Sequence, residues 1–317
     1  MPKIELLQMG AYPAGDEVAL NAEYVVHRYF EVPDTAAQKA EFLAKVAPHV
    51  RAIATRGDLG APASLINALP ALEVISVYGV GYDAVDLPAA RARGIPVTNT
   101  PDVLTGDVAD LAVAMWLMAR RRLAEAEVWA RSGDWSGAGF PLTRRAFGGR
   151  AGILGLGRIG RAIGERLVGF GMAVSYSSRT EKPTPGWVYR PDPVALAAGC
   201  DVLFVATAAT AQTRHVVNAP VLAALGPQGV LVNISRAANV DEQALLAALR
   251  AGTLGGAALD VFEGEPNYNP AFRDVPGLVM LPHIGSATQE TRKAMGQLMR
   301  DNLAAHFAGQ PLLTPVV

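Results

Sequence analysis

The sequence predicts an α/β protein with two domains, each built on a doubly wound parallel sheet. Short, continuous apolar runs alternate with helical patterns along the whole chain, which is typical of strands buried on both faces of a parallel sheet. Repeated strand–helix–strand units with right-handed connections wind such a sheet on both faces. The chain has 317 residues, about twice the roughly 150 residues of one domain.

Two series of strands are expected. The first comprises residues 3–9, 50–54, 73–77 and 95–98, and the second comprises residues 151–156, 173–177, 201–207, 229–235, 257–262 and 278–282. Helical patterns separate most of them, for example at 158–171 and 239–252. A helix at 102–122 is apolar nearly all round, which favours burial between layers or at a subunit interface. Residues 131–150 are expected to form a long connection.

Composition excludes several classes of protein. Hydrophobic residues make up 50% of the chain and charged residues 18%, which argues against disorder. Lys and Arg number 28 against 29 Asp and Glu, so no global basic field would hold nucleic acid or a membrane surface. The single cysteine, Cys200, allows no intrachain disulfide, and no metal site is expected. With no signal peptide or membrane span in the pattern, a cytoplasmic protein is expected.

A glycine-rich turn follows the first strand of the second series. Gly155-Leu156-Gly157-Arg158-Ile159-Gly160 matches the pattern GxGxxG, with an apolar strand before it and a helical pattern after it. The first glycine permits the tight turn, the second lets a pyrophosphate approach the backbone, and the third lets the helix pack against the strand. The N–H groups of the helix N-terminus would then face the phosphates. The turn therefore predicts a dinucleotide site.

The next strand ends in residues that suit a phosphate. Ser178, Arg179 and Thr180 stand where an NAD-preferring site usually has Asp or Glu to bind the ribose 2′-hydroxyl. A guanidinium and hydroxyls suit a 2′-phosphate, so NADP(H) is expected in preference to NAD(H). Glu181 would repel that phosphate if its side chain pointed inward.

Polar residues follow three apolar strands at their carboxyl ends, where ligands bind in open α/β sheets. Arg236 follows residues 229–235, Asp260 and Glu265 follow the next strand, and His283 follows the last. Arginine supplies a fixed cation for a carboxylate and a carbonyl oxygen. Histidine supplies a proton near neutral pH, and a carboxylate fixes its tautomer. Together they predict the reduction of a 2-keto acid.

These motifs resemble the D-2-hydroxyacid dehydrogenases. The resemblance is carried by the following segments: Gly155–Gly160, Ser235-Arg236, Leu259–Pro266, Leu281–Thr288 and the substrate loop Val77–Asp86. Within that family, Ser178-Arg179-Thr180 is most similar to the NADPH-dependent glyoxylate/hydroxypyruvate reductases, including the hydroxyphenylpyruvate reductase branch.

The resemblance implies two Rossmann-like domains with the active site in the cleft between them. Residues 1–99 and 287–317 would form a flavodoxin-like substrate-binding domain, and residues 100–286 would form the dinucleotide-binding domain. It also implies a homodimer, with the 102–122 region forming much of the interface.

The resemblance further implies residue roles. Arg236 would bind the substrate carboxylate and polarise the keto oxygen, His283 would donate the proton, and Glu265 would orient His283. The backbone N–H groups of Val80 and Gly81 would hold the carboxylate, and Asp260 would face the nicotinamide carboxamide. The other coenzyme contacts would come from Thr207, Thr213, Ile234, Ser235 and Gly285, and from Arg236 and His283 themselves.

The sequence departs from the family pattern at two places, and the roles of two aromatic residues stay open. Ala237 stands where the family often has glycine, and residues 207–213 lack the family's Leu-Thr-Pro. Trp135 and Phe140 could line the substrate site or pack at an interface.

We therefore expect NADPH-dependent reduction of glyoxylate, hydroxypyruvate or a larger 2-keto acid to the D-2-hydroxy acid. One alternative is another family activity, such as that of phosphoglycerate or formate dehydrogenase. A second is a dinucleotide-sensing scaffold, because some family relatives act as transcriptional corepressors.

Overall fold

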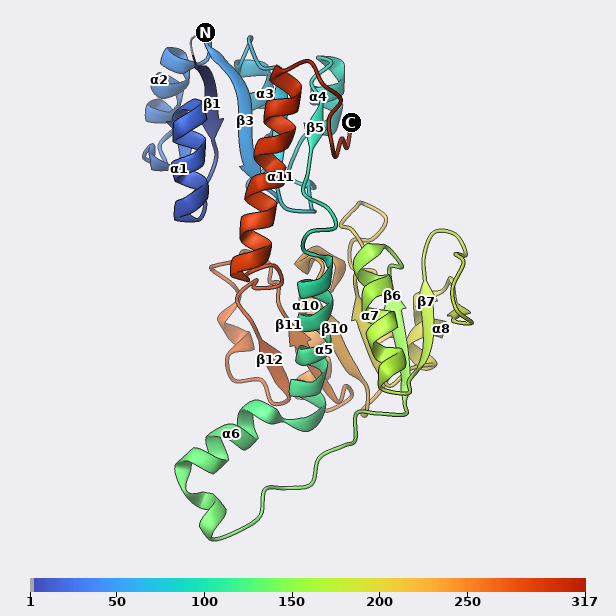
Figure 1. Cartoon of the computed structure of the whole chain (residues 1–317). Helices are drawn as coiled ribbons and strands as arrows, with labels where there is room; N and C mark the ends of the chain where they lie inside the picture. The colour runs from blue at the N-terminus through green and yellow to red at the C-terminus, as the bar shows by residue number, and fades with distance from the viewer. Residues whose placement is uncertain (1–2) are drawn as a thin grey trace. The chain divides into compact units, whose positions relative to one another are not determined.

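The computed structural model describes residues 3–317 and divides into two compact units. The first unit extends to Leu104 and includes Ala287–Val317, and the second is Thr105–Ser286 (Figure 1). The sequence suggested divisions at 99/100 and 286/287. The assignment of one unit to the substrate and the other to the coenzyme stays a prediction.

The first unit is built on a parallel sheet of five strands in the order β2-β1-β3-β4-β5. The strands are β1 (Ile4–Gln8), β2 (Tyr24–Arg28), β3 (Val50–Arg56), β4 (Val74–Tyr78) and β5 (Val97–Thr98). All five residues of β4 are buried, as its continuous apolar run predicts. The sequence did not predict β2, an edge strand on which Val25 is exposed.

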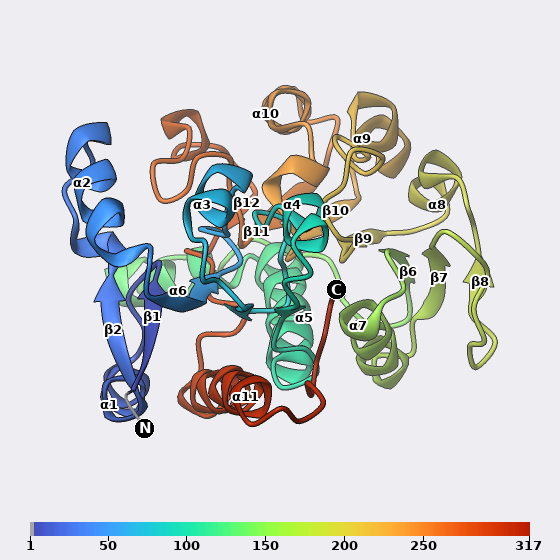
Figure 2. The same ribbon diagram turned by 90° about the horizontal axis from the view of Figure 1, so that it is seen from above.

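Helices cover both faces of this sheet. They are α1 (Ala14–Glu23), α2 (Ala36–Val46), α3 (Ala63–Ala68), α4 (Leu87–Ala92) and α11 (Gln289–Phe307). Figure 2 shows α2, α3 and α4 on one face, and α1 and α11 on the other. Three of the helices begin at a side-chain cap, supplied by Thr35, Asp86 and Thr288.

The second unit is built on a parallel sheet of seven strands in the order β12-β11-β10-β9-β6-β7-β8. The strands are β6 (Arg150–Leu154), β7 (Ala173–Ser177), β8 (Val188–Tyr189), β9 (Val202–Val205), β10 (Val230–Asn233), β11 (Gly256–Leu259) and β12 (Leu278–Met280). The sequence predicted all of them except β8, which has only two residues. The order reverses at β6, and this reversal creates a crevice at the carboxyl ends of the strands.

The helices of the second unit also lie on both faces, which confirms the doubly wound fold (Figure 2). One face carries α8 (Pro193–Ala198), α9 (Ala219–Leu225) and α10 (Glu242–Arg250), whose leucines and valines form one apolar core with the strands. The other face carries α5 (Thr105–Arg121) and α7 (Arg158–Gly169). Trp116 of α5 is almost completely buried against Phe170 and Phe204.

The predicted helix at 102–122 is shorter than expected, because Asp102 and Arg122 both have positive φ. The helix itself is α5, and its middle lies within the core of its own unit rather than at a surface. A second helix, α6 (Leu123–Ser132), begins directly after Arg122. With the following connection it forms a projecting segment, residues 123–147, which we call the arm (Figure 1). Among residues 3–317, no helix combines the length and apolar character needed to cross a bilayer.

Candidate active site

The glycine turn lies at the point where the strand order of the second unit reverses. β6 has β9 on one side and β7 on the other, and the turn Gly155–Gly160 leads from β6 into α7. Ligands of open α/β sheets bind at this position, outside the carboxyl ends of the strands. The glycine turn therefore lies at the position where the sequence predicts a dinucleotide to bind.

The three glycines of the turn meet different constraints. Gly155 has φ +103°, and a Cβ on it would lie 2.6 Å from the backbone nitrogen of Thr207. A Cβ on Gly160 would lie 2.1 Å from the carbonyl oxygen of Gly155. A Cβ on Gly157 would meet nothing within 4 Å, and no side chain caps the N-terminus of α7. The turn is thus tight where it packs and open where a pyrophosphate would approach, so these residues fit a dinucleotide.

Ser178, Arg179 and Thr180 lie directly after β7, the strand beside β6. Arg179, Thr180 and Glu181 are exposed, and Ser178 is half-buried. The hydroxyl of Ser178 donates to the carbonyl oxygen of Thr180 over 2.5 Å. The guanidinium and hydroxyls of the predicted 2′-phosphate site therefore share one short exposed loop.

The loop that carries Arg236 is held by buried polar side chains. The Asn233 carboxamide oxygen accepts from the N–H of Ser235 over 3.0 Å and from its hydroxyl over 2.8 Å. Asn239 donates to the Ser235 hydroxyl over 3.0 Å and to the Thr207 carbonyl over 2.9 Å. Asn233 and Asn239 are 1% and 0% exposed. This network, which the sequence reasoning missed, fixes the backbone beside the half-buried Arg236.

The two departures from the family pattern are accommodated locally. Ala237 begins a short 3₁₀ helix and does not have positive φ, so its methyl group causes no backbone strain. In the coenzyme loop, the Thr213 hydroxyl donates to the Ala208 carbonyl over 2.7 Å and accepts from the N–H of Thr210 over 2.8 Å. Threonine hydroxyls thus organise the loop that lacks Leu-Thr-Pro.

His283 and Glu265 form a direct pair. The Nδ1 atom of His283 lies 2.5 Å from Oε1 of Glu265, and Oε2 of Glu265 accepts from the N–H of Phe262 over 3.0 Å. With Nδ1 facing the carboxylate, Nε2 is the ring nitrogen left to face a substrate. The imidazole side chain is 44% exposed, so a substrate can reach it.

The pKa of Glu265 lies below its ordinary value. Burial alone would raise it, but the hydrogen bond and charge of His283, the Phe262 N–H and the charge of Arg236 outweigh that effect. Glu265 is therefore ionised at neutral pH and can stabilise a positive charge on His283.

Asp260 lies behind this pair and is 2% exposed. Its two carboxylate oxygens accept from the N–H groups of Ile284 and Gly285 over 2.8 and 2.9 Å. Burial raises the pKa of Asp260, although these two N–H groups oppose the effect. The carboxylate therefore fixes the backbone just after His283, a role that the sequence reasoning missed. Its contact with the carboxamide of nicotinamide stays a prediction.

The predicted substrate loop belongs to the first unit and follows β4. The carboxamide of Asn99 donates to the Val80 carbonyl over 2.8 Å, and Thr100 holds Gly79 through both its N–H and its hydroxyl. Among residues 3–317, the N–H groups of Val80 and Gly81 donate to no partner. They are therefore available to a carboxylate, and Asn99 and Thr100 are supports that the sequence reasoning did not find.

The fold and this site define an oxidoreductase that uses a nicotinamide dinucleotide. The family model described as "D-isomer specific 2-hydroxyacid dehydrogenase, NAD binding domain" matches residues 113–285. The chain belongs to that family, which confirms the resemblance found in the sequence.

Similar proteins cover the whole chain. A hydroxyphenylpyruvate reductase from Plectranthus scutellarioides is 46% identical over 317 residues, which is 100% of both chains. Glyoxylate/hydroxypyruvate reductase A from Arabidopsis thaliana is 49% identical over the same 100% of both. A solved NADPH-dependent glyoxylate/hydroxypyruvate reductase from Sinorhizobium meliloti, in complex with NADP and malonate, matches with a TM-score of 0.91. It is 42% identical, and the match covers 100% of this chain and 97% of that one.

Proposed function

We propose that this protein catalyses NADPH-dependent reduction of a small 2-keto acid of the glyoxylate or hydroxypyruvate type to the D-2-hydroxy acid. The observation that carries the proposal is the His283–Glu265 pair, which lies in the same unit as Arg236 and the glycine turn. The names of the similar proteins support the substrate class.

Each of the three side chains has a separate role in the reduction. When bound, the reduced nicotinamide supplies the hydride that the C2 atom of the keto acid accepts. Arg236 binds the substrate carboxylate and polarises the keto oxygen with its fixed positive charge. His283 holds a proton at Nε2 and donates it to that oxygen, so that C2 gains a hydrogen and the oxygen becomes a hydroxyl. Glu265 holds Nδ1 and orients the ring.

The coenzyme preference rests on the loop after β7. The Arg179 guanidinium and the Thr180 hydroxyl supply the charge and a donor that a 2′-phosphate needs. Ser178 joins them by turning its hydroxyl away from the Thr180 carbonyl. No acidic residue occupies the position after β7 from which a ribose 2′-hydroxyl is usually bound. The solved Sinorhizobium relative binds NADP, which supports the same preference here.

We assign the first unit to the substrate and the second to the coenzyme. The N–H groups of Val80 and Gly81 would hold the carboxylate together with Arg236. The remaining coenzyme contacts from the sequence, Thr207, Thr213, Ile234, Ser235, Asp260 and Gly285, belong to the second unit.

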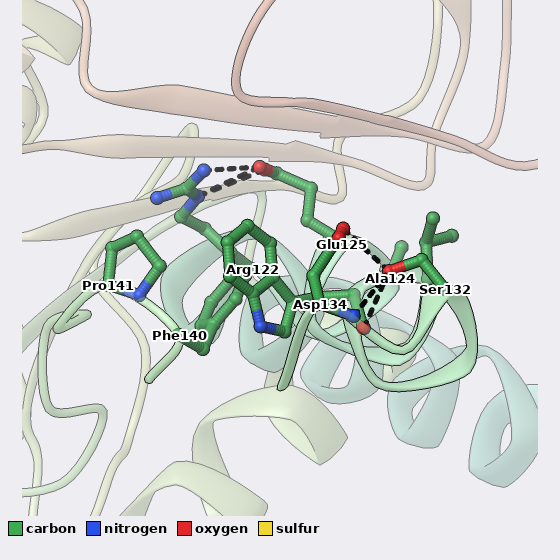
Figure 3. Close-up of a pocket in the computed structure, with 9 residues that line it drawn as sticks. Arg122, Ala124, Glu125, Ser132, Asp134, Phe140 and Pro141 are labelled. Atoms are coloured by element: carbon green, nitrogen blue, oxygen red, sulfur yellow. Dashed lines mark hydrogen bonds and ion pairs between the residues drawn. The ribbon is translucent and has the colours of Figure 1, made fainter. Parts of the chain in front are cut away.

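We also propose a homodimer, formed through the arm rather than through α5. Large apolar side chains are concentrated on the surface of the arm: Leu123, Val128, Trp135, Leu142 and Phe147, each between 45% and 101% exposed. A pocket of about 510 Å³ is lined by α6 and by the connection that follows it, with Trp129, Phe140 and Pro141 among the lining residues (Figure 3). Phe140 packs within the arm, edge to face on Trp129. A second copy of the chain would cover this apolar surface.

The proposed function is tested by initial rates of coenzyme oxidation with glyoxylate, hydroxypyruvate, pyruvate and phenylpyruvate, each with NADPH and with NADH. Turnover with NADPH on at least one substrate is expected, and the preferred substrate reports the size of the site. Oxidation of 3-phosphoglycerate is measured in parallel. Tight NADPH binding without any turnover would favour the sensing scaffold instead.

A further inference from the structure

The loop that carries Ser178, Arg179 and Thr180 is anchored by two tyrosines that lie outside it. Tyr176 of β7 is completely buried, and its hydroxyl donates to the Lys182 carbonyl over 2.9 Å and accepts from the Lys182 N–H over 2.8 Å. Tyr189 of β8 donates its hydroxyl to the Ser178 carbonyl over 3.1 Å. The two rings pack with their centroids 5.4 Å apart. The span Arg179–Glu181 is therefore held at both ends.

Two further contacts tie the far side of this loop to the helix of the glycine turn. Arg161 of α7 donates to the Pro183 carbonyl over 2.7 Å. Trp187 packs where α7 has Gly164, and a Cβ there would lie 2.4 Å from the indole ring. The loop is thus fixed to α7, whose N-terminus faces the expected pyrophosphate.

These anchors matter because the span itself is exposed and carries opposite charges. Arg179 and Glu181 are two residues apart, both exposed, and Arg179 makes no hydrogen bond or ion pair among residues 3–317. Ordering a mobile residue costs backbone conformational entropy. A loop that is already ordered avoids most of this cost when a ligand binds. Its fixed backbone also determines whether the guanidinium or the carboxylate meets a phosphate.

We propose that Tyr176 and Tyr189 are positioning residues for coenzyme discrimination. By holding the backbone at Ser178 and Lys182, they present Ser178, Arg179 and Thr180, and not Glu181, to the 2′-phosphate. The inference rests on the NADPH preference proposed above. It adds that the hydroxyls of Tyr176 and Tyr189 are needed for that preference.

The test uses Tyr176→Phe, Tyr189→Phe and the double variant. Each change removes one hydroxyl and keeps the ring, and the bonds lost between Tyr176 and the Lys182 backbone are only partly buried. Affinities for 2′,5′-ADP and 5′-AMP are measured by calorimetry, because the two probes differ only in the 2′-phosphate. Tyr24→Phe in the first unit, also a buried tyrosine, is the matched control. Thermal unfolding is measured for every variant.

Tyr189→Phe should bind 2′,5′-ADP about 3- to 10-fold more weakly, the range expected for one hydrogen bond, and Tyr176→Phe, which loses two hydrogen bonds, should lose at least as much. The double variant should lose more. Affinity for 5′-AMP, kcat/KM with NADH and KM for the keto acid should stay unchanged, as should every value for Tyr24→Phe.

Equal losses for the two probes would mean that the tyrosines only stabilise the loop, and no loss would mean that they do not act; both outcomes overturn the inference. If Arg179→Ala abolishes the preference for 2′,5′-ADP while the tyrosine variants keep it, the inference fails and the NADPH assignment survives. A wild-type protein that binds both probes equally overturns both.

Discussion

Replacing Glu265 by Gln gives the most direct test of the proton donor. The carboxylate holds two donors at once, His283 Nδ1 through Oε1 and the Phe262 N–H through Oε2. A carboxamide has only one oxygen, so its NH₂ group must face one of these two donors. The variant therefore removes the negative charge beside the imidazole and at least one hydrogen bond.

The size of the effect follows from the exposure of the pair. A hydrogen bond to a charged group contributes about 1.5–3 kcal/mol. The side chains of His283 and Glu265 are 44% and 29% exposed, so solvent screening places the effect in the lower part of that range. A loss of about 1.5–2 kcal/mol corresponds to a roughly 10- to 30-fold fall in kcat.

The assay is kcat between about pH 6 and 9, together with the Kd of NADPH. The fall in kcat should be present at every pH in this range, and the Kd of NADPH should stay unchanged. Glu263→Gln is the matched control, since it removes the same charge from an exposed carboxylate two residues away. An unchanged kcat, or an equal loss in the control, would refute the role of Glu265.

Four further predictions follow from the same geometry. Arg236→Ala should raise KM for the keto acid and lower kcat; an unchanged KM would count against carboxylate binding. Arg179→Ala should weaken NADPH binding by about 1.5–3 kcal/mol and leave NADH little affected, as measured by titration with each coenzyme. Val128→Glu, on the exposed face of α6, should shift the mass measured by light scattering from dimer to monomer, whereas Glu127→Gln should not. Because the pKa of Glu265 is lowered from about 4.5 in the folded protein, its ionised form stabilises the fold above that pH. This contribution is lost as the pH falls through the lowered pKa of Glu265. The Tm of the wild type should therefore fall more steeply on acidification than the Tm of Glu265→Gln.

The fold was predictable because buried parallel strands leave a strong pattern. Strands such as β9 and β10 are buried at every position and read as continuous apolar runs. β2 and β8 lie at the sheet edges and contain exposed valines, Val25 and Val188, so neither forms such a run. Burial was the detectable signal, and β2 and β8 lack it, whereas the other two edge strands, β5 and β12, kept enough apolar residues to be predicted.

The helix at 102–122 shows where a pattern was ambiguous. An apolar helix without a polar face can be buried in its own domain or at an interface, and the sequence does not distinguish the two. In the structure, Val108, Met115 and Trp116 pack inside their own unit. The exposed apolar side chains come later, on the arm, where they are interspersed with charged residues.

The candidate catalytic residues were predictable from their positions after strands, but the residues that hold them were not. All three catalytic candidates, Arg236, Glu265 and His283, follow strands of one parallel sheet. The topology alone therefore predicts that they lie near one another at the same edge of that sheet. The bond of Asn239 to Thr207 joins residues that are 32 positions apart in the sequence, and its bond to Ser235, four positions away, depends on exact loop geometry. No local pattern encodes such a bond.

The backbone at His283 explains why a buried carboxylate lies behind the site. His283 has φ +55°, in the left-handed region that costs a non-glycine residue about 1–3 kcal/mol. Asp260 supplies two charge-assisted bonds to the next two N–H groups, each contributing about 1.5–3 kcal/mol, and together they offset that strain. The imidazole is thereby held in a conformation that the local sequence would not adopt alone. Fixing the ring in this way before a substrate arrives leaves less reorganisation for the proton transfer itself.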